Sequence, residues 1–250
     1  MRQSLKDQEV GLDSHFNYRG KNQTRVETFS DAAFALAITL MVLSSTVPNN
    51  LNDLLISMKD IIPFGICVVI ILVIWYQHYI YFLRYGLQNL TVISLNTFLI
   101  FLILIYVYPL KFLFKVLIDL YINLFTGDQE SIQVLFTTVI PISDARFLMI
   151  IYGLGAALIY GTLALMYRYA LQKKQALQLN DYEIFKTKES IRTNLLMTSV
   201  PMLSTIIAVT GLFGSYNFIA SGVVYMLYPP VMITHGRLSS KKAKRMLEKK

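Results

Sequence analysis

Six long apolar stretches divide this sequence, and each is long enough to cross a lipid bilayer as an α-helix. They cover residues 26–47, 60–83, 90–110, 147–168, 194–212 and 216–234. A helix crosses the hydrocarbon core with about 20 consecutive apolar residues, so six spans use about half of the chain. Charged residues make up only 15% of it, against roughly a quarter in soluble domains. The sequence therefore predicts an all-α integral membrane protein with six transmembrane helices and no separate soluble catalytic domain.

The segments between the spans predict the domain organisation. Residues 1–24 form an N-terminal segment, residues 25–236 the six-helix transmembrane domain, and residues 237–250 a basic tail. The stretch 119–146 mixes polar and apolar residues and is predicted to be an interfacial or external loop. A charged segment, 172–192, separates the two apolar halves. The last two spans are joined so closely, around residues 211–217, that we expect an antiparallel hairpin.

The basic residues predict the orientation of the chain in the membrane. With six spans, 19 of the 23 Lys and Arg residues fall on the face that carries both termini. The other face has Lys59, Lys111, Lys115 and Arg146. Because cytoplasmic loops carry the excess of Lys and Arg, both termini are expected in the cytoplasm of a multi-pass plasma-membrane protein. The net charge of +8 is explained in this way, and no nucleic acid partner is expected.

Sequence patterns for catalysis and for metal binding are absent. The chain has no G-x-S-x-G, H-E-x-x-H, Walker A or G-x-G-x-x-G motif. Its three histidines form no ligand pair at helical spacing, and its single cysteine, Cys67, lies inside an apolar stretch. We therefore expect no enzymatic activity, no cofactor and no resident metal.

The start of the first span combines charged residues with a strongly apolar helix. Arg25, Phe29, Ser30 and Asp31 form the pattern R-x-x-x-F-S-D, which leads directly into a run rich in Ala and Leu. Ionisable groups inside a bilayer are costly, so the few that occur there are candidates for a functional role.

This pattern resembles the signature of the endosomal and lysosomal potassium channel family of the transmembrane protein 175 type, especially its bacterial single-repeat members. Trp75-Tyr76-Gln77-His78, Leu95-Asn96 and Pro109 support the resemblance. It implies a six-helix subunit, a homotetramer, and a potassium-permeable pore lined by the first helix of each subunit. The family lacks the usual potassium filter sequence, and so does this chain.

A line of leucines follows the motif. At about 100° per residue, Leu40 and Leu43 lie within about 40° of Leu36, and Thr39 lies about 60° away. Around a symmetry axis such a line would form apolar rings, which pass or block ions by wetting and dewetting. The resemblance places the family's constriction on this same face, with Leu36 where many bacterial members have isoleucine. The alternative interpretation is ordinary helix packing.

Asp31 lies about 140° from Leu36 on the helix and therefore faces away from any pore that the leucines line. A buried carboxylate there needs hydrogen-bond donors, and Trp75, His78 or Asn96 could supply them, with Ser30 adding a hydroxyl. The resemblance implies that such a network supports the pore helix from behind. A simple helix cap is the alternative for Ser30 and Asp31.

Two further side chains have more than one interpretation. Arg25 lies on the leucine face, where it could pair with another helix or subunit, lie at the cytoplasmic mouth, or extend to lipid phosphate. His78 could respond to pH or could be a neutral histidine in a helix interface.

Three classes of function fit the sequence. The first is a passive, potassium-permeable homotetrameric channel whose partners are potassium ions and the bilayer. The second is an ion- or proton-coupled secondary transporter, although the sequence shows neither an internal repeat nor a break in the first span. The third is a membrane scaffold.

Overall fold

The computed structural model describes residues 13–20, 22–44, 47–141 and 144–248. Its long helices are α2 (Arg25–Leu43), α4 (Ile61–Tyr85), α5 (Leu90–Thr126), α7 (Ala145–Gln172), α8 (Asp181–Thr210) and α10 (Tyr228–Leu247). Its short helices are α3 (Leu51–Lys59), α6 (Gln129–Val134), η1 (Leu135–Val139), η2 (Gly214–Tyr216), α9 (Asn217–Val223) and η3 (Val224–Leu227). Among these described residues there is no β-strand.

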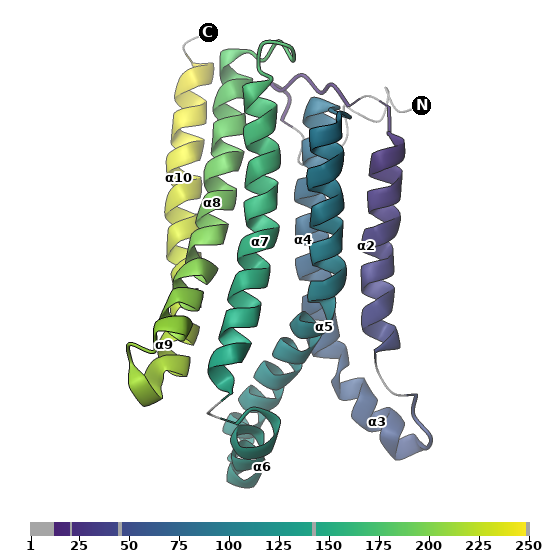
Figure 1. Ribbon diagram of the computed structural model, residues 1–250, viewed down its shortest axis with the longest axis vertical. Coiled ribbons are helices and arrows are strands. Elements are labelled where there is room, and N and C mark those ends of the chain that lie inside the picture. Colours follow the sequence, from purple (N-terminus) through teal and green to yellow (C-terminus); the bar gives the residue numbers. More distant parts are fainter. Residues whose placement is uncertain (1–12, 21, 45–46, 142–143, 249–250) are drawn as a thin grey trace.

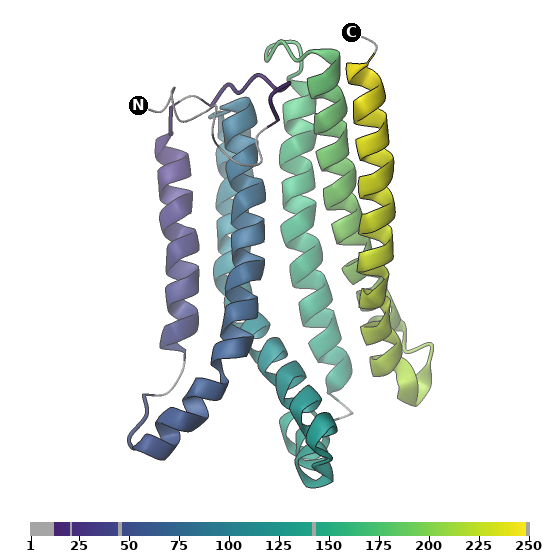
Figure 2. The same ribbon diagram turned by 180° about the vertical axis from the view of Figure 1, so that it is seen from behind.

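Six helical segments are long and apolar enough to cross a membrane. They are α2, α4, α5, α7, α8, and the combined segment Asn217–Leu247 made of α9, η3 and α10. These helices stand side by side, with α2 at one edge of the row and α10 at the other (Figures 1 and 2). The start of α2 and the end of α10 lie at the same end of the bundle (Figure 1), which we call the termini end. The prediction of an all-helical, six-span protein is confirmed.

The prediction of a loop over 119–146 is wrong, because most of this region is helical. Helix α5 continues through Pro109 to Thr126, and α6 and η1 follow it. A proline inside a helix removes one backbone hydrogen bond and bends the helix, and α5 changes direction along its length (Figures 1 and 2). The Tyr152 hydroxyl donates to the Pro109 carbonyl at 2.5 Å. The helix therefore bends at this region instead of ending there.

Two boundaries and one short helix also differ from the sequence prediction. Helix α8 begins at Asp181, well before residue 194, because Asn180 and Glu183 form a capping box at its start. Helix α10 continues to Leu247, so the basic residues between 237 and 247 lie on its last turns, whereas Lys249 and Lys250 lie outside the described residues. The short helix α3 was not predicted. Of the N-terminal segment 1–24, residues 1–12 and 21 lie outside the described residues.

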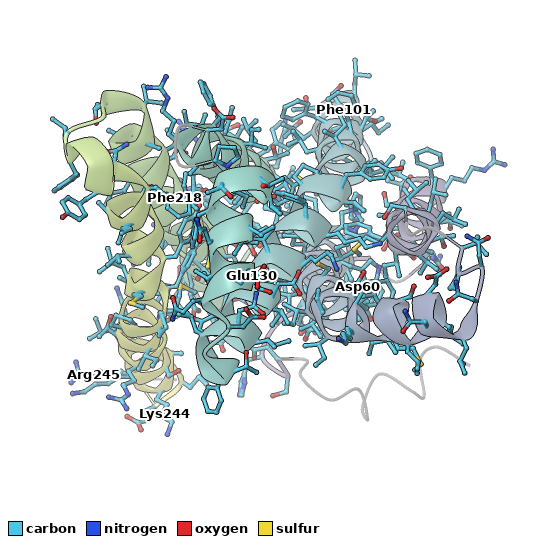
Figure 3. All side chains as sticks on the ribbon, turned by 90° about the horizontal axis from the view of Figure 1, so that it is seen from below. Asp60, Phe101, Glu130, Phe218, Lys244 and Arg245 are labelled. Atoms are coloured by element: carbon cyan, nitrogen blue, oxygen red, sulfur yellow. The ribbon has the colours of Figure 1, made fainter. Side chains whose placement is uncertain are left out.

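The view along the helices shows which parts of the bundle are peripheral. Figure 3 places α2 on one side of the molecule and α10, with Lys244 and Arg245 labelled, on the other. Asp60 lies where α3 meets α4, and Glu130 lies on α6 (Figure 3). Within the part of the chain that the structure describes, α2 packs mainly against α4 and α5. It therefore has a large face that no other part of the described subunit covers.

Residues 13–20 cross the termini end of the bundle and form a segment that we call the strap. Phe16 is buried in the main hydrophobic core. The Gly20 N–H donates to the Leu83 carbonyl at 3.0 Å, and a side chain on Gly20 would collide with the Phe82 carbonyl at 2.3 Å. Glycine at this position is thus what allows the strap to lie directly against the end of α4.

An ion pair fastens the strap to the start of α8. Arg19 Nη2 lies 2.8 Å from Glu183 Oε2, and the Glu183 side chain is fully buried. Two backbone N–H groups, those of Asn17 at 2.8 Å and Asn180 at 3.0 Å, also donate to the Glu183 carboxylate. Arg19 Nε donates to the Leu177 carbonyl at 2.6 Å. A buried carboxylate with this many donors is well satisfied, and it joins the strap to the turn between α7 and α8.

Replacing Glu183 with Ala should leave the Arg19 guanidinium and the Asn17 N–H without their shared acceptor. We expect the free energy of unfolding to fall by about 3 kcal/mol, the loss typical of breaking a buried ion pair by removing one partner. Unfolding of the purified protein in detergent measures this change. Asp181→Ala removes an exposed carboxylate from the same helical turn and should cost no more than about 1 kcal/mol. Equal losses in the two variants would contradict the fastening role of Glu183.

Candidate pore helix and its polar support

Hydrogen bonds between Thr24 and Glu27 fix the start of helix α2. The Glu27 N–H donates to Thr24 Oγ1 at 3.1 Å, and the Thr24 N–H donates to Glu27 Oε2 at 2.7 Å. This reciprocal pair is a capping box, which satisfies two backbone donors that would otherwise have no partner. From Arg25 to Leu43 the helix is continuous, with no glycine or proline. The sequence motif therefore lies on the first two turns of an unbroken helix.

The two faces of α2 differ sharply in exposure. Ser30, Phe34, Ala37 and Met41 are buried against the subunit. On the opposite face the Leu36 side chain is 49% exposed and that of Leu43 is 71% exposed, whereas Leu40 is half-buried. Thr39 is also exposed, and its hydroxyl donates to the Ala35 carbonyl at 3.0 Å. The leucine face thus points away from the subunit's own helices.

A buried chain of hydrogen bonds joins α2 to α5 and α4. Asn96 Nδ2 donates to Ser30 Oγ at 2.8 Å, and His78 Nε2 lies 2.7 Å from Asn96 Oδ1. Ser30 Oγ in turn donates to the Val26 carbonyl at 2.8 Å. Ser30, His78 and Asn96 are each at most 2% exposed. One polar side chain from each of three helices therefore contributes to a single network in apolar surroundings.

The direction of these hydrogen bonds specifies which histidine nitrogen carries hydrogen. With the amide of Asn96 oriented as above, its Oδ1 can only accept, so His78 Nε2 must donate. His78 Nδ1 is buried and has no hydrogen-bond partner among the described residues. The imidazole ring packs between Phe34 and Phe82, with ring centroids 5.5 and 4.8 Å away.

Asp31 has a separate set of partners on the neighbouring surface of α2. Trp75 Nε1 donates to Asp31 Oδ1 at 2.8 Å, and Gln23 Nε2 donates to Asp31 Oδ2 at 3.1 Å. Of the three donors expected from the sequence, Trp75 bonds to Asp31, whereas Asn96 donates to Ser30 and His78 bonds to Asn96. Gln23 was not predicted. Asp31 is only half-buried.

The far end of α2 also has a partner that the sequence analysis missed. Lys111 Nζ, on α5, donates to the Met41 carbonyl at 2.7 Å and to Ser44 Oγ at 2.9 Å. A cation is favourable at a helix C-terminus, where the last carbonyl groups lack intrahelical donors. The sequence feature that could have indicated this contact is a single lysine, two positions beyond Pro109, inside an otherwise apolar region.

The remaining motif residues lie at the start of α2. Phe29 is 65% exposed, and Arg25 is exposed and makes no ion pair with any residue that the structure describes. Over the described ranges no group of three or more His, Cys, Asp or Glu side chains could hold a metal ion. The chemistry of this region is therefore that of an apolar exposed face with a polar support behind it.

Replacing Asn96 with Ala should remove the central member of the buried chain and leave the His78 Nε2–H group unpaired. A buried donor without an acceptor costs about 1–3 kcal/mol, so the free energy of unfolding should fall by about that amount. Thr97→Ala, at the exposed neighbouring position of the same helix, serves as the matched control. Thermal unfolding in detergent gives both values, and an unchanged stability of the Asn96 variant would show that the network does not stabilise the fold.

Comparison with known proteins identifies the family. The endosomal/lysosomal potassium channel TMEM175 family matches residues 25–109, which hold α2, α4 and the first half of α5. A protein named "Potassium channel" from Marivirga tractuosa is 53% identical over 240 residues, which is 96% of each chain. The chain is also similar to a crystal structure of a variant of the potassium channel MtTMEM175, in complex with a nanobody–MBP fusion protein. The two sequences are 52% identical, the TM-score is 0.83, and the match covers 93% of this chain and 100% of the channel chain in that structure. With identity and fold shared over nearly its whole length, the chain belongs to the TMEM175 family of potassium channels, which are not enzymes.

Proposed function

We propose that this protein is a passive, potassium-permeable channel in which four copies of α2 surround a central axis. The observation that carries the proposal is the uncovered leucine face of α2, with Leu36 and Leu43 exposed at the edge of the subunit. The similar proteins from Marivirga tractuosa and in the crystal structure are both named potassium channels. A homotetramer would enclose the leucine face between its four copies. This face would then line the ion path instead of contacting lipid.

In this arrangement Leu36, Leu40 and Leu43 form stacked apolar rings and act as the constriction. Rings of this kind conduct when water fills them and block when water leaves. Thr39 is the polar residue on this face, and its hydroxyl oxygen keeps a lone pair that can contact a passing hydrated ion. Arg25 and Phe29 lie at the entrance, where Arg25 is free to pair with a neighbouring subunit.

Ser30, Asp31, Trp75, His78 and Asn96 have a supporting function in this proposal. Their hydrogen bonds lie on the side of α2 that faces α4 and α5, so they do not contact the ion. They fix the rotation of α2 about its own axis, and this rotation decides which side chains face the pore. Potassium is then the permeant ion, with no cofactor and no resident metal.

The orientation follows from the distribution of basic residues. The turn between α7 and α8, the start of α2 and the end of α10 share the termini end (Figures 1 and 2). Because Lys and Arg are enriched in cytoplasmic segments, we place the termini end in the cytoplasm of the cell. The potassium path then runs from Arg25 on the cytoplasmic side towards Leu43 on the outer side.

A potassium gradient alone should drive potassium flux through the purified protein in liposomes. The expected result is a flux that grows in proportion to the gradient and needs no second ion or solute. Light scattering of the same detergent-solubilised sample should give the mass of four chains. Saturable uptake that depends on a coupling ion would instead indicate a secondary transporter, and the absence of flux in correctly inserted protein would indicate a scaffold.

Polar substitution in the leucine rings should change conduction. We expect Leu36→Asn and Leu43→Asn to increase potassium conductance and to weaken selectivity against sodium, because an amide makes the constriction easier to wet. Val42→Asn is the matched control, since Val42 is 56% exposed on the same helix but lies about 120° from Leu36. Single-channel recording with potassium and sodium on opposite sides measures both effects. Currents of unchanged size and selectivity in both leucine variants would exclude these residues from the pore.

A further inference from the structure

A cavity with both polar and apolar lining lies at the termini end of the subunit, away from α2. It has a volume of about 330 Å³ and lies between the last turns of α4, α7, the first turns of α8 and Tyr18 of the strap. A water molecule occupies about 30 Å³ in the liquid, so the cavity is large enough for a ligand of several heavy atoms. The lining residues that matter for its chemistry are Arg84, Lys186, Glu189, Ser190, Thr193 and Asn194.

Three buried polar atoms of the lining have no hydrogen-bond partner among the described residues. They are Arg84 Nε, a donor, and two acceptors, Asn194 Oδ1 and Glu189 Oε2. Glu189 Oε2 lies 3.0 Å from Lys186 Nζ and is therefore compensated in charge. Asn194 is 1% exposed, and its Nδ2 already donates to the Ser190 carbonyl at 2.9 Å. Arg84 Nη1 donates to Ser190 Oγ at 3.1 Å. Because buried polar groups are normally hydrogen-bonded, these atoms indicate an occupant of the cavity that both accepts and donates hydrogen bonds.

The charge of the lining indicates the sign of that occupant. Lys186 Nζ lies 3.0 Å from Glu189 Oε2, so these two side chains compensate each other. Arg84 makes no ion pair with a described carboxylate, although its guanidinium stacks 4.9 Å above the centre of the Phe16 ring. The cavity therefore carries one positive charge in excess, on a guanidinium whose Nε–H finds no acceptor in the described part of the chain.

We propose that this cavity binds a phosphate group. Arg84 pairs with phosphate oxygens through the fork geometry that suits a guanidinium. Lys186, whose charge Glu189 compensates, supplies a further N–H donor from the same lining. A protonated phosphate oxygen, or a hydroxyl beside the phosphate, supplies the donor that Asn194 Oδ1 needs. The source is either a free phosphate compound or the head group of an anionic phospholipid, since the cavity lies at the termini end of the bundle.

Binding at Arg84 also stabilises the strap. The Arg84 carbonyl accepts a hydrogen bond from the Arg19 N–H at 3.3 Å, and the Arg84 guanidinium contacts Phe16. An anion that fixes the guanidinium thus fixes the surface on which the strap packs. A ligand at free concentration L that binds only the folded state raises the free energy of unfolding by RT ln(1 + L/Kd), so the melting temperature reports on binding.

Inorganic phosphate is the first probe, added to the full-length protein in detergent at constant pH and constant ionic strength set with sodium chloride. We expect Tm to rise with phosphate concentration as this relation predicts, and a fit of the rise gives the apparent Kd. Lys186→Gln should weaken the apparent affinity for phosphate at least fivefold, whereas Glu189→Gln, which removes the carboxylate from the lining, should strengthen it. Lys188→Gln is the matched control, because Lys188 is exposed on the same helix and is not part of the lining. It should leave the affinity unchanged.

The second experiment identifies the source of the phosphate. Protein reconstituted with phosphatidylcholine alone, or with added phosphatidylglycerol, is extracted and its retained lipid is measured by native mass spectrometry. Phosphatidylglycerol that is retained by the wild type and by Lys188→Gln, but lost from Lys186→Gln, indicates a lipid head group. Saturable phosphate binding without retained lipid indicates a free phosphate compound. The proposal is overturned if neither ligand binds, or if Lys186→Gln and Lys188→Gln weaken binding equally.

Discussion

The need to satisfy polar groups inside an apolar bundle determines how α2 is placed. Ser30, Asn96 and His78 come from three different helices, and each would be costly to bury without a partner. Their short chain of hydrogen bonds can form only when α2 has one particular height and rotation relative to α4 and α5. The hydrogen bonds on the buried side of α2 therefore determine that Leu36 and Leu43 point outward.

The ends of α2 are fixed by different chemistry from its middle. At the first turn, the capping box of Thr24 and Glu27 satisfies free N–H groups, and at the last turn Lys111 donates to the Met41 carbonyl and to Ser44 Oγ. Both devices are local and depend on side chains within reach of a helix terminus. With the buried chain between them, α2 is supported at three levels, although the described subunit covers only one of its faces.

The sequence predicted the six spans, the family, and Trp75 as one of three alternative donors to Asp31, because length, apolar content and a seven-residue motif are local signals. It could not predict that Asn96 bonds to Ser30 and His78 to Asn96, since that choice depends on how α4 and α5 are rotated about their axes. Helix α3 and the early start of α8 were not predicted, because neither belongs to a long apolar run. Their signals were the caps Asn50 and Asn180, each followed three residues later by an acidic side chain.

The strap has a mechanical consequence for α2. It is fastened to α8 at Arg19 and to the end of α4 at Gly20, and only a few residues separate these points from the first turn of α2. A tether this short limits sliding of α2 along its own axis more than it limits tilting or twisting about the fixed end. Any axial displacement of this helix must therefore either carry the strap with it or break the contacts of the strap with α4 and α8.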